Sequence, residues 1–385
     1  MPTPETPRGI RKFLEKVHGI EDPRVERTRV HTLENIVTLA LLAMLGGAKG
    51  WDGIEMWAAE NVDWIDEFLD FTHGIPSADT FRRFFCAVDP DSFERFMRDW
   101  AESIGRPFRG QVAFDGKAVR GAIRRAETSV PLHLMQAWSV EHGLVLAQTS
   151  VEGAPGEPAA MLKMLRELDL RGATVTADAN NCTKEILQQV QGAGADFVLS
   201  IKGNRGPLFD SVKRIFDPET LIAESTFEES DRGHGREEHR KTWAFEVKSW
   251  QALPLTSANS ESSWEGIRTV VVTDRRRREG EQETQTRSFH ISSLRPDAKR
   301  HAEVIRAHWG IENRNHWMLD VNLGEDSARI RDKRGAENLS RLRRMALGII
   351  KRGTFPKKAK SVPLRQFWMS MRPTRYIDLL ANAFS

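Results

Sequence analysis

Gly110-Gln-Val-Ala-Phe-Asp115-Gly-Lys117 is a short apolar run that ends in an acidic residue. Such a run is typical of a buried strand, here residues 112–114, that carries a carboxylate to one end of a sheet. The segment Ala173-Thr-Val-Thr-Ala-Asp178 repeats the pattern with small and β-branched residues. Because a sheet fixes the geometry of residues at its strand ends, Asp115 and Asp178 are candidate metal ligands. Taken singly, an Asp after an apolar run is more often a turn or helix N-cap residue.

Glu312 is the third candidate carboxylate, within the helix-like segment Ile305-Arg-Ala-His-Trp-Gly-Ile-Glu312-Asn-Arg-Asn-His-Trp317. Three carboxylates can hold two divalent metals about 3.5–4 Å apart, which activate a water and stabilise the leaving oxygen of a phosphodiester. His308 and His316 lie four residues to either side of Glu312, on the same helix face. A zinc site from His-x3-Glu-x3-His is an alternative, although neither HExxH nor a cysteine pair supports it.

The order of expected elements indicates an α/β protein with a mixed sheet. Residues 8–105 are expected to be mostly helical, with Ser77 as the N-cap of one helix. A strand, a hairpin at 132–151, a helix at 157–168, a strand at 173–177, a helix at 183–192 and a strand at 196–201 follow. Residues 205–294 are expected to form a β-rich insertion, in which the four arginines at 275–278 are most simply a solvated loop. From residue 297 the chain is expected to be helical again.

Composition bounds the class of protein. The chain has 385 residues, 29% of them charged and 39% hydrophobic, which predicts a globular protein of two or three domains. Its two cysteines, Cys86 and Cys182, cannot build a disulfide framework, and a reducing cytoplasm fits them. Residues 1–30 lack the apolar core of a signal peptide, and the apolar stretch 36–48 is too short to span a bilayer.

The net charge of +3 conceals an asymmetry along the chain. Residues 295–385 contain 20 Lys and Arg against 9 Asp and Glu, which gives +11, and the remainder, with 37 against 45, gives −8. A basic last quarter favours a polyanionic partner such as nucleic acid, because Lys and Arg displace counterions from phosphates. The alternative is a solvated helical face that acidic surface elsewhere balances.

Several segments together resemble the DDE transposases of bacterial insertion sequences, in the ISAs-type or H-repeat-associated branch. The resemblance covers about residues 15–350. It is carried by Phe-Asp115-Gly-Lys117-Ala-Val-Arg120-Gly, Thr176-Ala-Asp178-Ala, Leu199-Ser-Ile-Lys202-Gly-Asn204, Gly233-His-Gly-Arg236, Ile291-Ser-Ser-Leu294, Arg306-Ala-His-Trp309-Gly-Ile-Glu312-Asn313, His316-Trp317-x-Leu-Asp320-Val and Glu325-Asp326.

The resemblance implies a fold and a domain plan. It implies an RNase H-like catalytic core at residues 108–385, with a β-rich insertion at about 205–294 and a basic helical C-terminal part. An all-helical N-terminal domain, residues 1–107, is expected to precede the core.

The resemblance also implies a reaction, its cofactors and its partners. Asp115, Asp178 and Glu312 would be catalytic and would hold two Mg²⁺ ions, with Mn²⁺ as a substitute. Water would cut the phosphodiester at the ends of the element, and the freed 3′-hydroxyl would attack target DNA. The partners would be double-stranded DNA, both terminal inverted repeats and target, and a second copy in an active homodimer, with no membrane involved. The expected location is the bacterial cytoplasm, in association with the nucleoid.

A further set of residues is assigned to DNA contact or to support of the catalytic carboxylates: Lys117, Arg120, Lys202, Asn204, His234, Arg236, Arg306, His308, Trp309, Asn313 and His316. Some of these have simpler interpretations. Lys202 and Asn204 suit an ordinary strand-to-helix turn, and the Gly-His-Gly stretch around His234 suits a hairpin turn. Trp309 and Trp317 suit core packing.

The chain departs from the family pattern at four positions, namely Asn181, Thr183, Arg205 and Asn315. The family usually has His, Gln, Gln and Leu there. None of the four is an expected ligand, but Asn181 and Thr183 follow the second Asp closely, where side chains tune hydrogen bonding to metal or DNA. A catalytically inactive, transposase-derived DNA-binding protein is therefore the alternative function.

Overall fold

The computed structural model describes residues 8–104, 108–120, 132–152, 156–233, 235–248, 264–328 and 330–384. The chain forms two compact units, each assembled from separate segments. The first unit contains Met1–Arg106, Gly116–Val151 and Glu312–Ser385, and the second contains Pro107–Asp115 and Glu152–Ile311. The strand β1 (Gln111–Val119) belongs to both units, since the boundary falls between Asp115 and Gly116.

The described strands form one mixed sheet in the order β3-β2-β1-β4-β5-β9-β8-β7-β6. The remaining strands are β2 (Leu132–Ser139), β3 (Leu144–Ser150), β4 (Thr174–Ala177), β5 (Asp196–Ile201), β6 (Ser225–Gly233), β7 (Arg236–Glu246), β8 (Thr269–Glu279) and β9 (Gln282–Ser292). Pairs β1–β4 and β4–β5 are parallel, whereas β2–β3 and the pairs from β5 to β6 by way of β9, β8 and β7 are antiparallel. The expected α/β class with a mixed sheet is confirmed.

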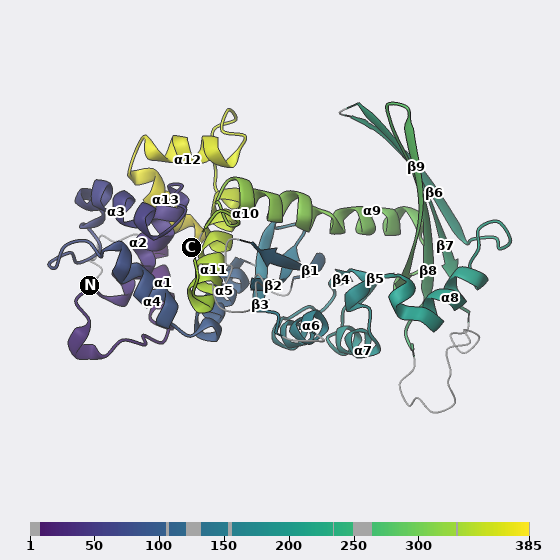
Figure 1. Ribbon diagram of the computed structural model, residues 1–385, viewed down its shortest axis with the longest axis horizontal. Helices are drawn as coiled ribbons and strands as arrows, with labels where there is room; N and C mark the ends of the chain where they lie inside the picture. Colours follow the sequence, from purple (N-terminus) through teal and green to yellow (C-terminus); the bar gives the residue numbers. More distant parts are fainter. Residues whose placement is uncertain are drawn as a thin grey trace. The chain divides into compact units, whose positions relative to one another are not determined.

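The first unit is mainly helical. Its helices are α1 (Arg8–Val17), α2 (Leu33–Leu45), α3 (Trp51–Ile65), α4 (Ala78–Ala87), α5 (Pro90–Ile104), α10 (Trp317–Val321), α11 (Lys333–Arg352), α12 (Val362–Ser370) and α13 (Thr374–Ala383). The apolar α2 is buried from Asn35 to Leu45, and α11 packs against it and against α4 and α5 (Figure 1). The predicted N-cap of α4 is confirmed, because the Ser77 hydroxyl accepts a hydrogen bond from the backbone N–H of Thr80 at 3.3 Å.

The second unit combines the parallel strands with α6 (Gly156–Glu167), α7 (Lys184–Gly192), α8 (Gly206–Ile215) and α9 (Ala298–His308). α9 contacts β4 and β5, and α7 contacts β5; Figure 1 shows α9 on one side of these strands and α6 and α7 on the other. Side chains alternate between the faces of a strand. One face therefore carries the apolar set Val112, Phe114, Val175, Ala177, Phe197, Leu199 and Ile201, and the other carries polar groups. The polar face lies under α9 and holds the site described below.

The β-rich insertion is longer and more regular than the sequence indicated. β6 was not expected, and the four arginines at 275–278 lie within β8, so their prediction as a loop is wrong. Each of them has an acidic or polar residue opposite it on β7 or β9, which supports an extended strand despite the charge. In register, Gly233 pairs with Arg236, so β6 and β7 form a hairpin; Gly235 in its turn has φ 76°.

The late helical segment is interrupted where continuous helix was expected. α9 ends at His308, and a π-helical turn, Ile311–His316, precedes α10. π-helical turns are rare and occur frequently at functional sites. No helix in the described part of the chain is long and apolar enough to cross a membrane.

Candidate active site

Asp115 and Asp178 occupy corresponding positions on neighbouring strands. Phe114 of β1 pairs with Ala177 of β4 in parallel register, so the two aspartates that follow lie side by side, about 5 Å apart in the pairing direction. Asp178 keeps an extended backbone (φ −72°, ψ 176°), and both carboxylates therefore point to the face that α9 covers. Each is half-buried. Two adjacent carboxylates with partial access to solvent suit a hard divalent cation such as Mg²⁺.

The turn after β4 fixes one oxygen of Asp178. The 3₁₀ turn Ala179–Asn181 brings the Asn181 side chain back, and its amide donates to Asp178 Oδ1 at 2.8 Å and to Glu157 Oε2 at 3.3 Å. No hydrogen bond to Asp178 Oδ2 is found within the described residues. The sequence indicates Asn181 as a departure from the family pattern at a position that can tune hydrogen bonding near the second aspartate, and the structure shows that it contacts Asp178 directly.

A polar chain joins α9 to the sheet beside Asp178. Gln111 of β1 donates to the hydroxyl of Thr176 (3.2 Å) and to the carbonyl of Val304 in α9 (2.9 Å). The same hydroxyl lies 2.9 Å from Nδ1 of His308. Thr176 is two residues before Asp178 and shares its strand face, so α9 is anchored next to the aspartate.

The histidines of this face are held neutral. Burial lowers the pKa of His308 to about 4. Burial, and then the neighbouring His308, His301 and Lys202, lowers the pKa of His290 to about 3. An uncharged imidazole at neutral pH can donate one hydrogen bond and accept another, but it adds no positive charge that would repel a cation.

Glu312 lies in the π-helical turn of the first unit and is exposed. Two contacts within that unit hold the turn: Asn315 donates to Gln136 of β2 at 2.9 Å, and Lys351 of α11 donates to the carbonyl of Arg314 at 3.1 Å. Asn315 and Gln136 are both buried, so the Asn that stands where the family usually has Leu is paired with a second amide. Burial lowers the pKa of Lys351 to about 8.

The described residues contain no group of three or more His, Cys, Asp or Glu side chains placed to hold a metal ion. The expected acidic residues are divided between the two units, with Asp115 and Asp178 in the second and Glu312 in the first. The assignment of these three residues as a set of ligands therefore stays a prediction.

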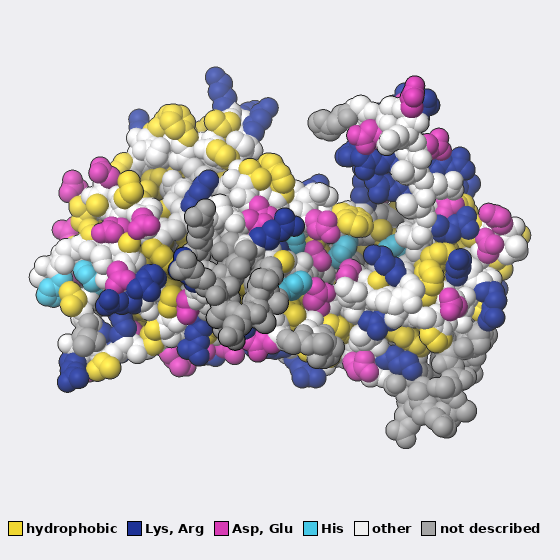
Figure 2. Space-filling view, in the orientation of Figure 1, with side chains coloured by type: hydrophobic (Ala, Val, Ile, Leu, Met, Phe, Trp, Pro, Cys, Tyr) yellow, Lys and Arg dark blue, Asp and Glu magenta, His cyan; other side chains and the backbone are white. Residues whose placement is uncertain are grey.

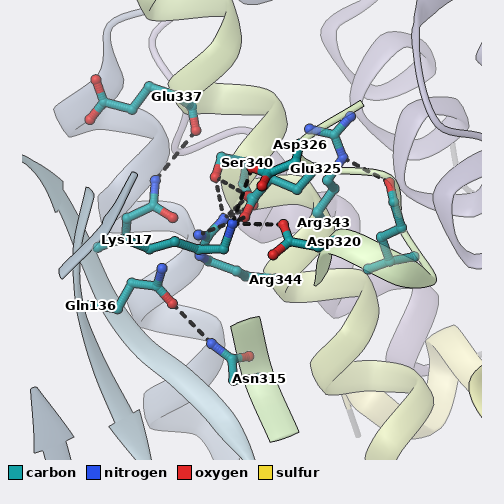
Figure 3. A network of polar contacts seen from close by, with 12 residues as sticks. Lys117, Gln136, Asn315, Asp320, Glu325, Asp326, Glu337, Ser340, Arg343 and Arg344 are labelled. Atoms are coloured by element: carbon teal, nitrogen blue, oxygen red, sulfur yellow. Dashed lines mark hydrogen bonds and ion pairs between the residues drawn. The ribbon is translucent and has the colours of Figure 1, made fainter. Parts of the chain in front are cut away.

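Lys117 is the centre of a buried ionic cluster in the first unit (Figure 3). Its amine lies 2.7 Å from Asp320, 3.2 Å from Glu325 and 3.5 Å from Asp326. Glu325 also pairs with Arg344 at 2.5 Å and accepts a hydrogen bond from Ser340 at 2.6 Å. Sequence reasoning assigned no role to the other members of the cluster. The available signal was local: Ser340, Arg343 and Arg344 lie among the apolar residues Leu339, Leu342 and Met345 of α11.

Ion pairing outweighs burial for two members of this cluster. Burial alone would lower the pKa of Lys117, but Glu325 and Asp320 raise it. Burial alone would raise the pKa of Glu325, but Arg344 and Lys117 lower it. Both groups are therefore charged at neutral pH, and each has its counter-charge in direct contact.

The other expected contact residues have varied environments. Lys202, Asn204, Arg236 and Asn313 are exposed, and Trp309 is 54% exposed, which is not the core packing considered for it. Trp317 is equally exposed. His234 lies outside the described residues.

Two arginines of the expected set meet carboxylates. Arg306 forms ion pairs with Glu229 at 3.0 Å and Asp231 at 2.7 Å on β6. The backbone N–H of Arg120 donates to Asp326 at 3.1 Å, and its side chain is exposed.

The loop after β5 supports the turn that carries Asn181. Asn204 donates to the carbonyl of Ala179 at 3.1 Å, and Arg205 donates to the carbonyl of Asn180 at 2.7 Å. Thr183, another departure, is the N-cap of α7 and accepts from the N–H of Ile186 at 3.2 Å. The loop after β5 therefore holds the backbone of the turn that follows Asp178, and Thr183 starts the helix after that turn.

Two family models cover most of the chain. Residues 107–349 match the model described as "Transposase DDE domain", and residues 14–101 match the model described as "DDE_Tnp_1-associated".

Full-length relatives are also found. The Escherichia coli O157:H7 protein named "Putative transposase YncI" is 32% identical over 92% of this chain and 92% of its own length. The E. coli K12 protein named "H repeat-associated putative transposase YhhI" is 29% identical over 89% of this chain and 90% of its own length. A solved piggyBac transposase synaptic complex with hairpin DNA is 11% identical over all of this chain and 83% of that one, with a TM-score of 0.42, too low to support a conclusion.

Proposed function

The chain belongs to the DDE transposase family, and on that premise we propose that it cuts DNA at the ends of an insertion sequence and joins the freed 3′-hydroxyls to target DNA. The observation that carries this proposal is the parallel register that sets Asp115 beside Asp178. In the proposed core, which is RNase H-like, these two residues are the strand-end pair of the catalytic triad.

Glu312 completes the proposed triad. A π-helical turn presents it, and the buried amide pair and Lys351 fix the backbone of that turn. Asp115, Asp178 and Glu312 would hold two Mg²⁺ ions, for which Mn²⁺ would substitute. When bound, such a metal pair supplies an activated water and stabilises the leaving oxygen of the phosphodiester.

The chain's own residues have separate tasks in this proposal. Asn181 orients Asp178, and Thr176 with His308 anchors α9 beside it. The exposed Lys202 would contact a phosphate, and the exposed Trp309 would stack on a base. Lys117 would act through the buried cluster as a structural support of the core, since its amine is committed to three carboxylates.

The remaining members of the contact set are proposed to touch DNA or to support the carboxylates: Arg120, Asn204, Arg236, His234, Arg306, Asn313 and His316. The partners proposed are the inverted repeats, target DNA and, in the active state, a second copy of the chain. The proposed domains are residues 1–107 and 108–385, with the β-rich insertion at about 205–294.

The test is cleavage of labelled duplex DNA that carries the gene's own flanking sequences, in Mg²⁺ and in Mn²⁺. Cuts at a defined flanking position are expected from the wild type. Asp115→Asn, Asp178→Asn and Glu312→Gln are each expected to abolish cleavage while binding of the same DNA is retained.

Near-normal cleavage by any of these variants would exclude that residue as a ligand. Wild-type binding without cleavage in either metal would favour the alternative, a catalytically inactive DNA-binding protein. A nuclease without joining activity would cut the DNA but leave its 3′-hydroxyl ends unjoined.

A further inference from the structure

The turn between β4 and α7 contains a buried amide that touches two carboxylates. Asn181 is fully buried, with 0% of its surface exposed. Its nitrogen lies 2.8 Å from Asp178 Oδ1 and 3.3 Å from Glu157 Oε2. Because both neighbours are oxygens that accept hydrogen bonds, the amide nitrogen must face them, and each of its two hydrogens has an acceptor.

We infer that Asn181 is the positioning residue of Asp178, an inference that rests on the proposed function. It holds Oδ1 by one hydrogen bond and thereby sets the rotation of the carboxylate, so that Oδ2 points away from the amide. A carboxylate that is free to rotate samples several orientations, and fixing one of them favours a single coordination geometry.

Glu157 prevents the amide itself from rotating. It comes from the first turn of α6, a different element from the turn that carries Asn181, and takes the second hydrogen of the amide. If the Asn181 side chain turned over, its carbonyl oxygen would face two carboxylates, and this arrangement is strongly unfavourable in a buried environment. Glu157 therefore fixes the orientation of the Asn181 amide, and the amide in turn fixes the orientation of the Asp178 carboxylate.

The backbone of the turn is fixed from outside by the loop after β5. Asn204 and Arg205 donate to the carbonyls of the two residues that precede Asn181, at 3.1 Å and 2.7 Å. The Lys-Gly-Asn motif thus contributes to the orientation of Asp178 through the turn, in addition to any contact that Lys202 makes with DNA. Arg205 contributes one of these bonds although it departs from the family pattern.

The amide provides the donor without charge. A cationic donor at this distance would compete with a metal for the negative charge of Asp178, whereas a neutral amide leaves that charge available. An Asn at position 181 is consequently compatible with catalysis, because its amide donates a hydrogen bond to the Asp178 carboxylate without adding a positive charge.

The test replaces the donor with an apolar side chain of similar size in the full-length protein. Asn181→Leu is expected to lower kcat for cleavage of the flanking-sequence duplex about 10- to 100-fold and to leave KM for that DNA unchanged. The apparent affinity for Mn²⁺, measured without DNA by electron paramagnetic resonance, is expected to fall by a similar factor. Gln188→Leu, at an exposed position of α7, is the matched control and is expected to change neither value.

A rescue variant separates positioning from simple packing. Asn181→His retains a ring N–H donor and is expected to recover most of the Mn²⁺ affinity that Asn181→Leu loses. Circular dichroism of each variant establishes that it folds. If Asn181→Leu does not fold, the comparison of Asn181→His with the wild type still decides, because loss of Mn²⁺ affinity in a folded, donor-bearing variant would overturn the inference.

Asp178→Asn makes the failure of this inference distinguishable from failure of the proposed function. If Asp178→Asn weakens Mn²⁺ binding and Asn181→Leu does not, the positioning role is wrong and the metal site stands. If Asp178→Asn leaves Mn²⁺ binding unchanged, Asp178 is not a metal ligand. In that case the proposed catalytic triad is wrong, and the positioning role of Asn181 is wrong as well.

Discussion

Two clusters of arginine in this chain have opposite environments. Arg341, Arg343 and Arg344 of α11 are no more than 2% exposed, whereas Arg276 and Arg278 of β8 are exposed. The two clusters are similar in composition, and neither is interrupted by an acidic residue. Charge in the sequence therefore does not indicate where that charge lies in the fold.

The difference follows from the partners that each element meets. Arg341 lies 2.8 Å from Glu94 and 2.7 Å from Glu337, and Arg344 lies 2.5 Å from Glu325, so their guanidinium groups have carboxylates inside the first unit. The arginines of β8 lie on a ribbon with acidic residues on neighbouring strands, and Figure 2 shows Lys, Arg, Asp and Glu interspersed over it. Three of the basic residues that suggested a polyanionic partner are consequently unavailable to it.

The largest loss of stability is expected from breaking the buried ion pair between Arg344 and Glu325. Arg344→Met removes the nearer of the two ion pairs that Glu325 forms among the described residues. Because Glu325 stays buried, we expect a loss of about 3 kcal/mol in the free energy of unfolding. Urea unfolding of the full-length protein measures it. The double variant Arg344→Met, Glu325→Leu is expected to recover most of the loss, because neither charge is then left unpaired. Equal losses in the single and double variants would contradict a mainly ionic role.

A smaller loss of stability is expected when acid protonates Glu325. Arg344 and Lys117 lower the pKa of Glu325 in the folded state below the ordinary value of 4.5. The unfolded chain therefore binds the proton more tightly, and the stability that Glu325 contributes is present above pH 4.5 and lost as the pH falls through the lowered folded-state pKa. Thermal unfolding between pH 6 and pH 3 should show a steeper acid-side decline in the wild type than in Glu325→Gln. Parallel curves would show that Glu325 titrates normally.

The smallest loss of stability is expected from substitution of an exposed arginine of β8. Arg276→Ala removes an exposed side chain that forms no ion pair with the other described residues, so the melting temperature should change by no more than about 1 to 2 °C. Differential scanning calorimetry measures the change. A decrease as large as that of Arg344→Met would mean that β8 depends on its arginines as α11 does.

Much of the fold could be predicted from local pattern. The strand β5 has the bounds expected for it, and the hairpin β2–β3 and the helices α6 and α7 lie within one or two residues of expectation. In these segments the apolar periodicity and the flanking turn residues indicate the same element with the same ends. β6 and the arginine-rich part of β8 were missed, because cross-strand pairs stabilise them and no apolar alternation marks them.

The candidate site could be predicted only in part. The strand-end aspartates were recognisable because an Asp after an apolar run is a local signal, and the register of β1 and β4 places them together. The partners of these residues were not recognisable. Glu157 lies 21 residues before Asp178 in sequence, and Gln136 lies 179 residues before Asn315; only the folded chain brings each into contact.

The first unit is also assembled from distant segments, and this has a consequence for synthesis on the ribosome. The apolar α2 is complete at residue 45, but α11, which packs against it, begins at residue 333. At about 5–20 residues per second, roughly 15 s to one minute of translation separates the two helices. Throughout that interval the nascent chain contains a mostly apolar helix that lacks α11, one of the helices that pack against it in the folded protein. Chaperones that shield apolar segments should therefore bind the growing chain early and be released only when α11 has emerged.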